Sequence, residues 1–154
     1  MAVRFALHFI LFLVLLIFET VTYQGARAGA PPVDPCTLVT KSEMEQIAGK
    51  LKSGPKPGSA FGSEDKSCEY VFETTLNVLV FRVHPAEKWD MFTGAYKERK
   101  QIAGLGEVAF MRRSSTQGTE LWLKKGSVIL QLSLKSATAE EKLKALAKKA
   151  VTRF

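Results

Sequence analysis

An apolar run near the N-terminus decides which part of this chain can fold into a domain. The run spans residues 5–18, follows Arg4 and is interrupted only by His8. Its 14 residues are fewer than the roughly 20 that span a membrane, and they match the core of a cleavable signal peptide. Small residues predict cleavage after Ala28, with cleavage after Ala30 as the alternative. We therefore expect the protein to be exported.

Removal of the signal peptide, residues 1–28, leaves one predicted domain over residues 29–154, a length typical of a single folded unit. Cleavage removes two basic residues and one acidic residue, so the formal charge falls from +7 to +6. An uncleaved N-terminal anchor is the alternative, and Glu19 and the short apolar run argue against it. We expect a soluble protein of the periplasm or the extracellular medium, with no stable transmembrane span after processing.

Cys36 and Cys68 are the only cysteines of the chain. In an oxidising compartment the simplest prediction is one disulfide between them. It would close a loop of 33 residues, which the chain-entropy model associates with roughly 3–4 kcal/mol of stabilisation. A reactive or metal-binding pair is the alternative, but the two cysteines lack a C-x-x-C spacing.

Capping boxes and apolar spacing predict the helices. Thr40 and Glu43 form a capping box ahead of apolar residues at helical spacing, which predicts a helix over residues 41–50. Thr138 and Glu141 form a second box before the final predicted helix. A middle helix after Pro85 is predicted from the spacing of its aromatic residues, which are Trp89, Phe92 and Tyr96.

Alternating apolar residues predict the strands. The Gly- and Pro-rich segment 53–59 is predicted to be a loop. The element order α-β-β-α-β-β-β-α predicts an α+β fold, with an antiparallel sheet of about five strands and helices packed on one face. The predicted strands cover residues 68–74, 76–84, 107–113, 119–125 and 127–134.

Three short motifs resemble those of a family of small exported α+β proteins of unknown function, typified by actinobacterial lipoproteins. They are Asp-Pro-Cys at residues 34–36, Cys-Glu-Tyr at 68–70 and Gly-Leu-Gly-Glu at 104–107, the last being Gly-Leu-Gly-Asp in the family. The resemblance covers nearly all of the predicted mature chain. It implies an exported domain with a disulfide between the two cysteine positions and no shared enzymatic activity. This chain lacks the lipidation cysteine, which favours a soluble form.

No catalytic, metal or cofactor site is predicted. His84 is the only histidine of the predicted mature domain and ends an apolar strand beside Pro85, a place typical of a surface or capping residue. Nucleophilic catalysis needs a base beside a nucleophile, and the sequence carries no recognisable set of this kind. Nucleic acid is not an expected partner either, because the chain is predicted to be exported and contains no recognition motif.

Two candidate binding sites remain. Trp122 alternates with Leu121 and Leu123, so it lies on the open sheet face if the leucines face the helices, unless loops cover it. An exposed tryptophan among charges is typical of a binding surface. That candidate surface comprises Trp122, Lys124, Arg112, Arg113, Lys97 and Lys100. The candidate apolar pocket comprises Trp89, Phe92 and Phe110.

Three functional hypotheses follow. The first is a non-enzymatic exported module that binds a protein partner or an anionic envelope component through its basic surface. The second is a carrier that holds a small apolar ligand between the sheet and the helices. The third is a hydrolase, which requires a cleft that brings His84 together with a carboxylate and a serine or threonine.

Export and the disulfide can be tested on natively secreted protein. We expect an N-terminus at Gly29 by mass spectrometry and no thiol labelling without a reductant. An N-terminus at Met1 would contradict the predicted cleavage, and two labelled thiols would contradict the predicted disulfide.

Overall fold

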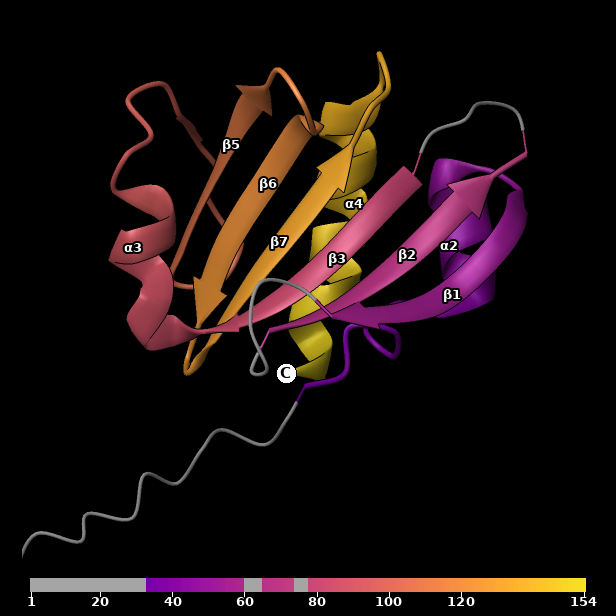
Figure 1. The fold of residues 1–154 in the computed structure, drawn as a ribbon, viewed down its shortest axis with the longest axis horizontal. Coiled ribbons are helices and arrows are strands. Elements are labelled where there is room, and N and C mark those ends of the chain that lie inside the picture. The colour runs from indigo at the N-terminus through magenta and orange to yellow at the C-terminus, as the bar shows by residue number, and fades with distance from the viewer. Residues whose placement is uncertain (1–32, 60–64, 74–77) are drawn as a thin grey trace, which may run out of the picture.

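A seven-stranded antiparallel sheet organises the part of the chain that the computed structural model describes, which comprises residues 33–59, 65–73 and 78–154. The strands lie in the order β1-β2-β3-β7-β6-β5-β4 across the sheet (Figure 1). The predicted signal peptide and its cleavage site lie outside the described residues. The strand bounds are β1 (Leu51–Ser59), β2 (Lys66–Phe72), β3 (Val78–Pro85), β4 (Lys100–Gln101), β5 (Val108–Ser114), β6 (Gly118–Lys125) and β7 (Val128–Leu134).

The α+β class and the antiparallel sheet are confirmed. The five predicted strands correspond to β2, β3, β5, β6 and β7, with ends that shift by at most two residues where they are described. The junction between the predicted strands 68–74 and 76–84 lies outside the described residues. The predicted number of strands is too low, because the short edge strand β4 and the whole of β1 were not expected.

The segment predicted as a loop forms most of edge strand β1, so that prediction is wrong. Residues 53–59 pair with β2, with two register shifts along β1. Pro55 and Pro57 are tolerated because an edge strand leaves one side of its backbone unpaired. Gly54 has a φ of 117°, and a Cβ there would lie 2.8 Å from the carbonyl oxygen of Glu69. Backbone pairing therefore orders a segment that has no apolar alternation.

The main core lies on the sheet face that packs against α2 (Lys41–Ala48) and α4 (Ala139–Ala150), which lie behind the sheet in Figure 1. Every residue of the central strand β7 is buried. Helix α4 buries an apolar stripe against this face, which continues through the partly buried Val151 of η2 (Val151–Arg153) and Phe154. Fully buried members of this core include Leu79, Phe81, Leu121, Leu123, Leu130, Leu132, Leu143 and Leu146.

Helix α2 begins as predicted. The Glu43 backbone N–H donates to the Thr40 hydroxyl, and the Thr40 backbone N–H donates to the Glu43 carboxylate, so the capping box is confirmed. The helix ends at Ala48, two residues earlier than expected, with Gly49 after it. Arg153 donates to Glu43 at 2.8 Å and to the carbonyl oxygen of Leu38 at 2.6 Å. These bonds join the start of α2 to the end of the described chain.

The prediction of a second capping box, at Thr138 and Glu141, is wrong. The Thr138 side chain accepts no hydrogen bond from the first turn of α4, and its hydroxyl lies 3.3 Å from the Ser136 hydroxyl instead. Thr138 has φ −100° and ψ 20°, outside the extended region that an N-cap side chain needs to reach the helix. The motif therefore matched in sequence without the backbone conformation that capping requires.

The middle helix is shorter than predicted and lies on the other face of the sheet. It consists of η1 (Ala86–Lys88) and α3 (Trp89–Thr93). The Thr93 hydroxyl donates to the carbonyl oxygen of Trp89, and Gly94, a poor helix former, follows. Its aromatic side chains pack on Phe110, Trp122 and Ile129, which face away from α2 and α4. The prediction that the helices share one face is therefore wrong.

The predicted disulfide between Cys36 and Cys68 is confirmed, with a Cα–Cα distance of 5.2 Å. It fastens the segment before α2 to β2, and the Asp34 carboxylate accepts a hydrogen bond from the Cys36 backbone N–H at 2.9 Å. Among the described residues, no helix has the length and apolar character that crossing a membrane requires.

Acid should weaken the contact between α2 and the C-terminal turn. The backbone N–H of Thr40 and then the guanidinium of Arg153 lower the pKa of Glu43 from 4.5 to about 2. Because the folded-state pKa is the lower one, this stabilisation is present above pH 4.5 and is lost as the pH falls toward 2. We expect E43Q to flatten the decline in the free energy of unfolding over this interval.

Denaturant unfolding at several pH values measures this effect. E141Q is the matched control, since Glu141 is exposed on α4 and forms no ion pair within the described chain. Equal pH profiles for E43Q and E141Q would contradict the prediction.

Candidate functional site

The sheet face opposite α2 and α4, called here the second face, carries polar side chains in ordered rows. Antiparallel register places facing residues of adjacent strands side by side. One row runs across β2, β3, β7, β6 and β5 through Ser67, Arg82, Gln131, Trp122 and Phe110. The next row runs through Glu69, Val80, Ser133, Glu120 and Arg112.

An aromatic cluster covers one end of the second face. Trp122 points to the predicted face, but only 2% of it is exposed, because α3 and Tyr96 cover it. The ring centroids of Trp122 and Tyr96 lie 6.0 Å apart. The expectation of an exposed tryptophan is therefore wrong, and covering by neighbouring segments is the alternative that holds. Trp122 is therefore too deeply buried to serve as the exposed part of a binding surface.

The three residues of the candidate apolar pocket meet within this cluster. The ring centroids of Trp89 and Phe110 lie 5.7 Å apart. Phe92 packs against the imidazole of His84 at 4.4 Å and against Trp122 at 6.0 Å. Neither of the two cavities described below is lined by Trp89, Phe92 or Phe110. The aromatic rings pack against one another and so fill the space between α3 and the sheet.

His84 is buried rather than at the surface, with 3% of the residue exposed. Its Nδ1 lies 2.9 Å from Oδ1 of the buried Asp65, and the Lys88 ammonium lies 3.6 Å from the same oxygen. Asp65 comes one step before the Lys66–Val83 pair, which places it opposite His84. No sequence pattern pointed to this carboxylate, because only the strand register brings the two residues together.

The His84–Asp65 pair supplies part of what a hydrolase needs. His84 Nε2 is buried and has no hydrogen-bond partner among the described residues. A general base must reach the hydroxyl that it activates, and no serine or threonine of the described chain hydrogen-bonds this nitrogen. Nor do the described residues include a group of three or more histidine, cysteine, aspartate or glutamate side chains that could hold a metal ion.

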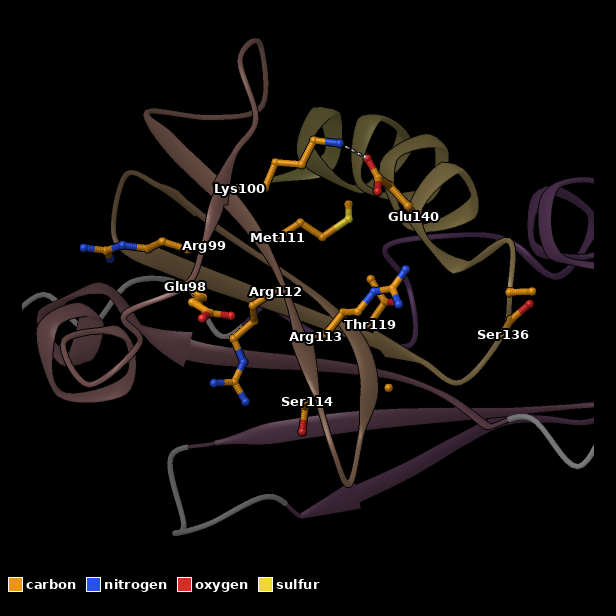
Figure 2. A pocket seen from close by; sticks show the side chains of 12 residues that line it. Glu98, Arg99, Lys100, Met111, Arg112, Arg113, Ser114, Thr119, Ser136 and Glu140 are labelled. Carbon is orange, nitrogen blue, oxygen red and sulfur yellow. Dashed lines mark hydrogen bonds and ion pairs between the residues drawn. The ribbon is translucent and has the colours of Figure 1, made fainter.

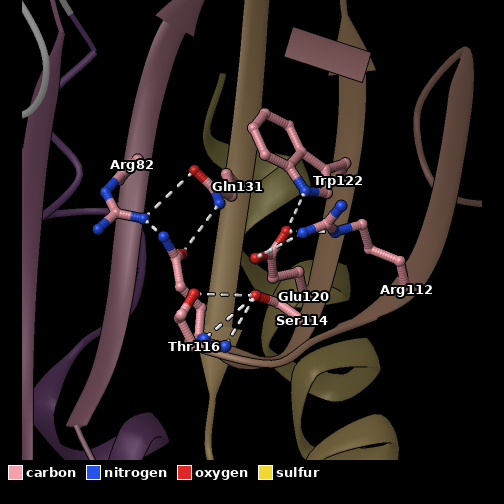
Figure 3. A network of polar contacts seen from close by, with 8 residues as sticks. Arg82, Arg112, Ser114, Thr116, Glu120, Trp122 and Gln131 are labelled. Carbon is pink, nitrogen blue, oxygen red and sulfur yellow. Dashed lines mark hydrogen bonds and ion pairs between the residues drawn. The ribbon is translucent and has the colours of Figure 1, made fainter. Parts of the chain in front are cut away.

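A buried carboxylate organises the second row of the second face. Glu120, 2% exposed, accepts hydrogen bonds from Arg112 Nε and from Trp122 Nε1, each at 2.9 Å (Figure 3). Arg112 Nη2 reaches the other carboxylate oxygen at 3.5 Å. The Arg112 guanidinium also lies 3.7 Å from the centre of the Tyr96 ring. Burial raises the pKa of the Tyr96 hydroxyl, and Arg112 opposes that shift.

A second polar group surrounds Arg82, also shown in Figure 3. Arg82 Nη1 donates to Gln117 Oε1 at 3.0 Å and to Gln131 Oε1 at 3.4 Å. The Gln131 amide nitrogen donates to the same Gln117 oxygen at 3.4 Å. Neutral amides thus hold this guanidinium, in contrast to the carboxylate that holds Arg112.

A basic groove lies at the β5 edge of the sheet. It is a cavity of about 710 Å³, and the Arg112 and Arg113 side chains point to opposite sides of the strand (Figure 2). Three residues of the predicted binding surface, Lys100, Arg112 and Arg113, line the groove together. The other three, Trp122, Lys124 and Lys97, do not. The lining also includes Glu98, Arg99, Met111, Ser114, Thr119, Ser136 and Glu140.

Two cations of the groove are neutralised within the protein. Lys100 pairs with Glu140 at 2.7 Å (Figure 2), and Arg112 pairs with Glu120. Hydrogen bonds from Lys100 and Lys144 lower the pKa of Glu140 to about 2. Arg99 and Arg113 form no ion pair with the described residues, although Arg99 lies 5.5 Å from the centre of the Phe110 ring. Arg99 and Arg113 are therefore the two lining residues of the groove whose positive charge is not compensated within the described chain.

A second cavity, of about 630 Å³, lies where the segment before α2 meets the C-terminus. Its basic lining residues are already engaged. Lys125 donates to the carbonyl oxygen of Val151 at 2.8 Å and to a terminal oxygen of Phe154. Arg153 is held by Leu38 and Glu43. This cavity therefore offers less free charge than the groove.

The fold and these sites define an α+β protein with one antiparallel sheet, one disulfide and a basic groove at the sheet edge. Comparison of the chain with protein-family models, with curated proteins and with solved structures finds no match in any of the three. The resemblance to small exported proteins of unknown function therefore stays a prediction.

The Glu120 carboxylate should matter strongly for stability. E120A leaves the Arg112 charge and the buried Trp122 N–H without their acceptor. We therefore expect the free energy of unfolding to fall by about 3 kcal/mol or more. Chemical denaturation measures the loss. E69A is the control, because Glu69 is exposed in the same row and forms no ion pair within the described chain, and it should change stability by less than about 0.5 kcal/mol. Similar losses in both variants would contradict this account.

Proposed function

We propose that the protein is a non-catalytic exported module that binds an anionic group in the basic groove. The observation that carries the proposal is that two exposed arginines, Arg99 and Arg113, line the groove without an ion pair among the described residues, with side chains that point in opposite directions in Figure 2. The ligand is an anionic envelope component, such as a lipid headgroup or an acidic polysaccharide, or the acidic surface of a protein partner.

The charge distribution of the groove supports an anion over a cation. Four basic residues line it against two acidic ones, Glu98 and Glu140, and Glu140 is already shared by Lys100 and Lys144. A guanidinium group matches the oxygens of a carboxylate or a phosphate through paired donors. The exposure of Arg99 and Arg113 lets a large ligand reach them without a conformational change.

The surroundings of His84 support a binding role rather than a hydrolytic one. Its imidazole packs against Phe92 and lies against Asp65 beside the aromatic cluster, and it does not line the groove. The imidazole packs beneath Phe92 of α3, away from the lining of the groove. Binding at the groove needs no group from this cluster.

Retention on anionic vesicles across a salt series tests the proposal. We expect binding at low salt that weakens as salt rises, because exposed charges are screened within about 10 Å at 0.1 M ionic strength. R99E/R113E should weaken binding at low salt by about tenfold or more, equivalent to about 1.4 kcal/mol. Vesicles of zwitterionic lipid and insoluble peptidoglycan are the comparison surfaces.

K56E/K148E is the charge-matched control, since Lys56 and Lys148 are exposed, lie outside the groove and form no ion pair within the described chain. It should retain most of the binding. Equal losses in the two double variants would assign the binding to overall charge, and no retention on any surface at low salt would overturn the proposal.

A further inference from the structure

We infer that Arg82 is a receptor for an oxyanion that presents two oxygens, a carboxylate or a phosphate ester. The site lies on the second face, and Arg82 does not line the basic groove. It therefore goes beyond the proposed function and does not depend on it. The inference rests on how the guanidinium is held and on what it leaves unbound.

Arg82 is tied through one nitrogen only. Nη1 makes both hydrogen bonds, to Gln117 and to Gln131, while Nε and Nη2 make none with the described residues. Nε–H and one Nη2–H lie parallel on the same edge of a guanidinium, and this edge pairs with two oxygens of one carboxylate or phosphate. The half-buried side chain therefore presents its paired donors as a free edge.

The same sheet face contains a filled version of this arrangement. Arg112 uses its Nε and Nη2 edge to hold the two oxygens of Glu120. Arg82 lies on β3 in the neighbouring row, and β7 separates it from Glu120 on β6. At Arg82 the facing residues are Ser67 and Gln131, which are neutral. The protein supplies a carboxylate to one arginine and leaves the equivalent edge of the other for a ligand.

Two carboxylates lie diagonally from Arg82, Glu69 on β2 and Asp65 just before β2. Neither of them pairs with the Nε and Nη2 edge of Arg82. Asp65 is engaged by His84 and Lys88. Glu69 is exposed, and no ion pair joins it to Arg82. Glu69 therefore adds negative charge near the site without occupying it, so its removal should favour anion binding.

The hairpin between β5 and β6 positions the site. Ser114 Oγ accepts hydrogen bonds from the backbone N–H groups of Thr116 and Gln117, which fixes the turn. The Gln117 side-chain oxygen then accepts hydrogen bonds from both Arg82 and Gln131. The arginine is thus ordered before a ligand arrives, which reduces the entropy lost on binding.

Nuclear magnetic resonance of the disulfide-bonded protein tests the inference, with sodium acetate and methyl phosphate as separate probes at constant ionic strength. We expect a saturable shift of the Arg82 Nε–H signal with at least one probe, and the probe that binds identifies the oxyanion. Sodium chloride is the control for screening. No saturable shift with either probe, or the same shift with chloride, would overturn the inference.

Variants separate recognition from simple charge. R82K keeps the charge but removes the paired donors, so binding followed at the Gln131 amide should weaken by about tenfold. E69Q should strengthen binding severalfold, whereas a large shift of the Arg82 signal in E69Q without any probe would show that Glu69 fills the edge and would overturn the inference. The Trp122 indole N–H, held by Glu120, reports that each variant is folded. R99E/R113E should leave the acetate and methyl phosphate titrations unchanged, so this site and the groove can fail separately.

Discussion

The apolar contact between α4 and the central strands β6 and β7 is the interaction on which the rest of the structure depends. Leu143 and Leu146 are fully buried there against strands whose own leucines are fully buried. Each such side chain contributes roughly 1.5–3 kcal/mol when it leaves water. This contact fixes which sheet face the long helix α4 covers, and the edges of the sheet are β1 and β4. The second face is consequently left to polar side chains and to the short helix α3.

The second face holds two half-buried arginines, Arg112 and Arg82, in different ways. Glu120 compensates Arg112 within the protein and at the same time satisfies the indole of Trp122. Arg82 has only the neutral side chains of Gln117 and Gln131 as hydrogen-bond partners among the described residues. Burying a carboxylate without a cation costs several kcal/mol of stability, about 3–5 kcal/mol. A half-buried arginine stays partly hydrated and can therefore remain without an anion until a ligand binds. The difference between these two arginines separates a structural ion pair from a candidate binding site.

Patterns local in sequence predicted the elements that depend on local physics. The alternation in residues 128–134 predicted β7, and the Thr40–Glu43 capping box predicted the start of α2, because both signals act within a few residues. The same reasoning failed for β1, where edge pairing with β2 orders a segment rich in Gly and Pro. It also failed for Thr138, whose backbone conformation does not match its sequence motif. Charge made Lys100, Arg112 and Arg113 candidate residues, whereas Arg99, which lines the same groove, was not among the candidates.

Composition and local spacing were enough to establish the α+β class, five of the seven strands and the Cys36–Cys68 pair, since each follows from short-range preferences or from having two cysteines only. Strand register decided the rest. It set Asp65 against His84, Glu120 against Arg112 and Gln131 against Arg82, pairs whose members lie up to 49 residues apart in the chain. No local preference encodes such pairs, because a carboxylate or an amide acquires its partner only after the long-range apolar contacts have aligned the strands.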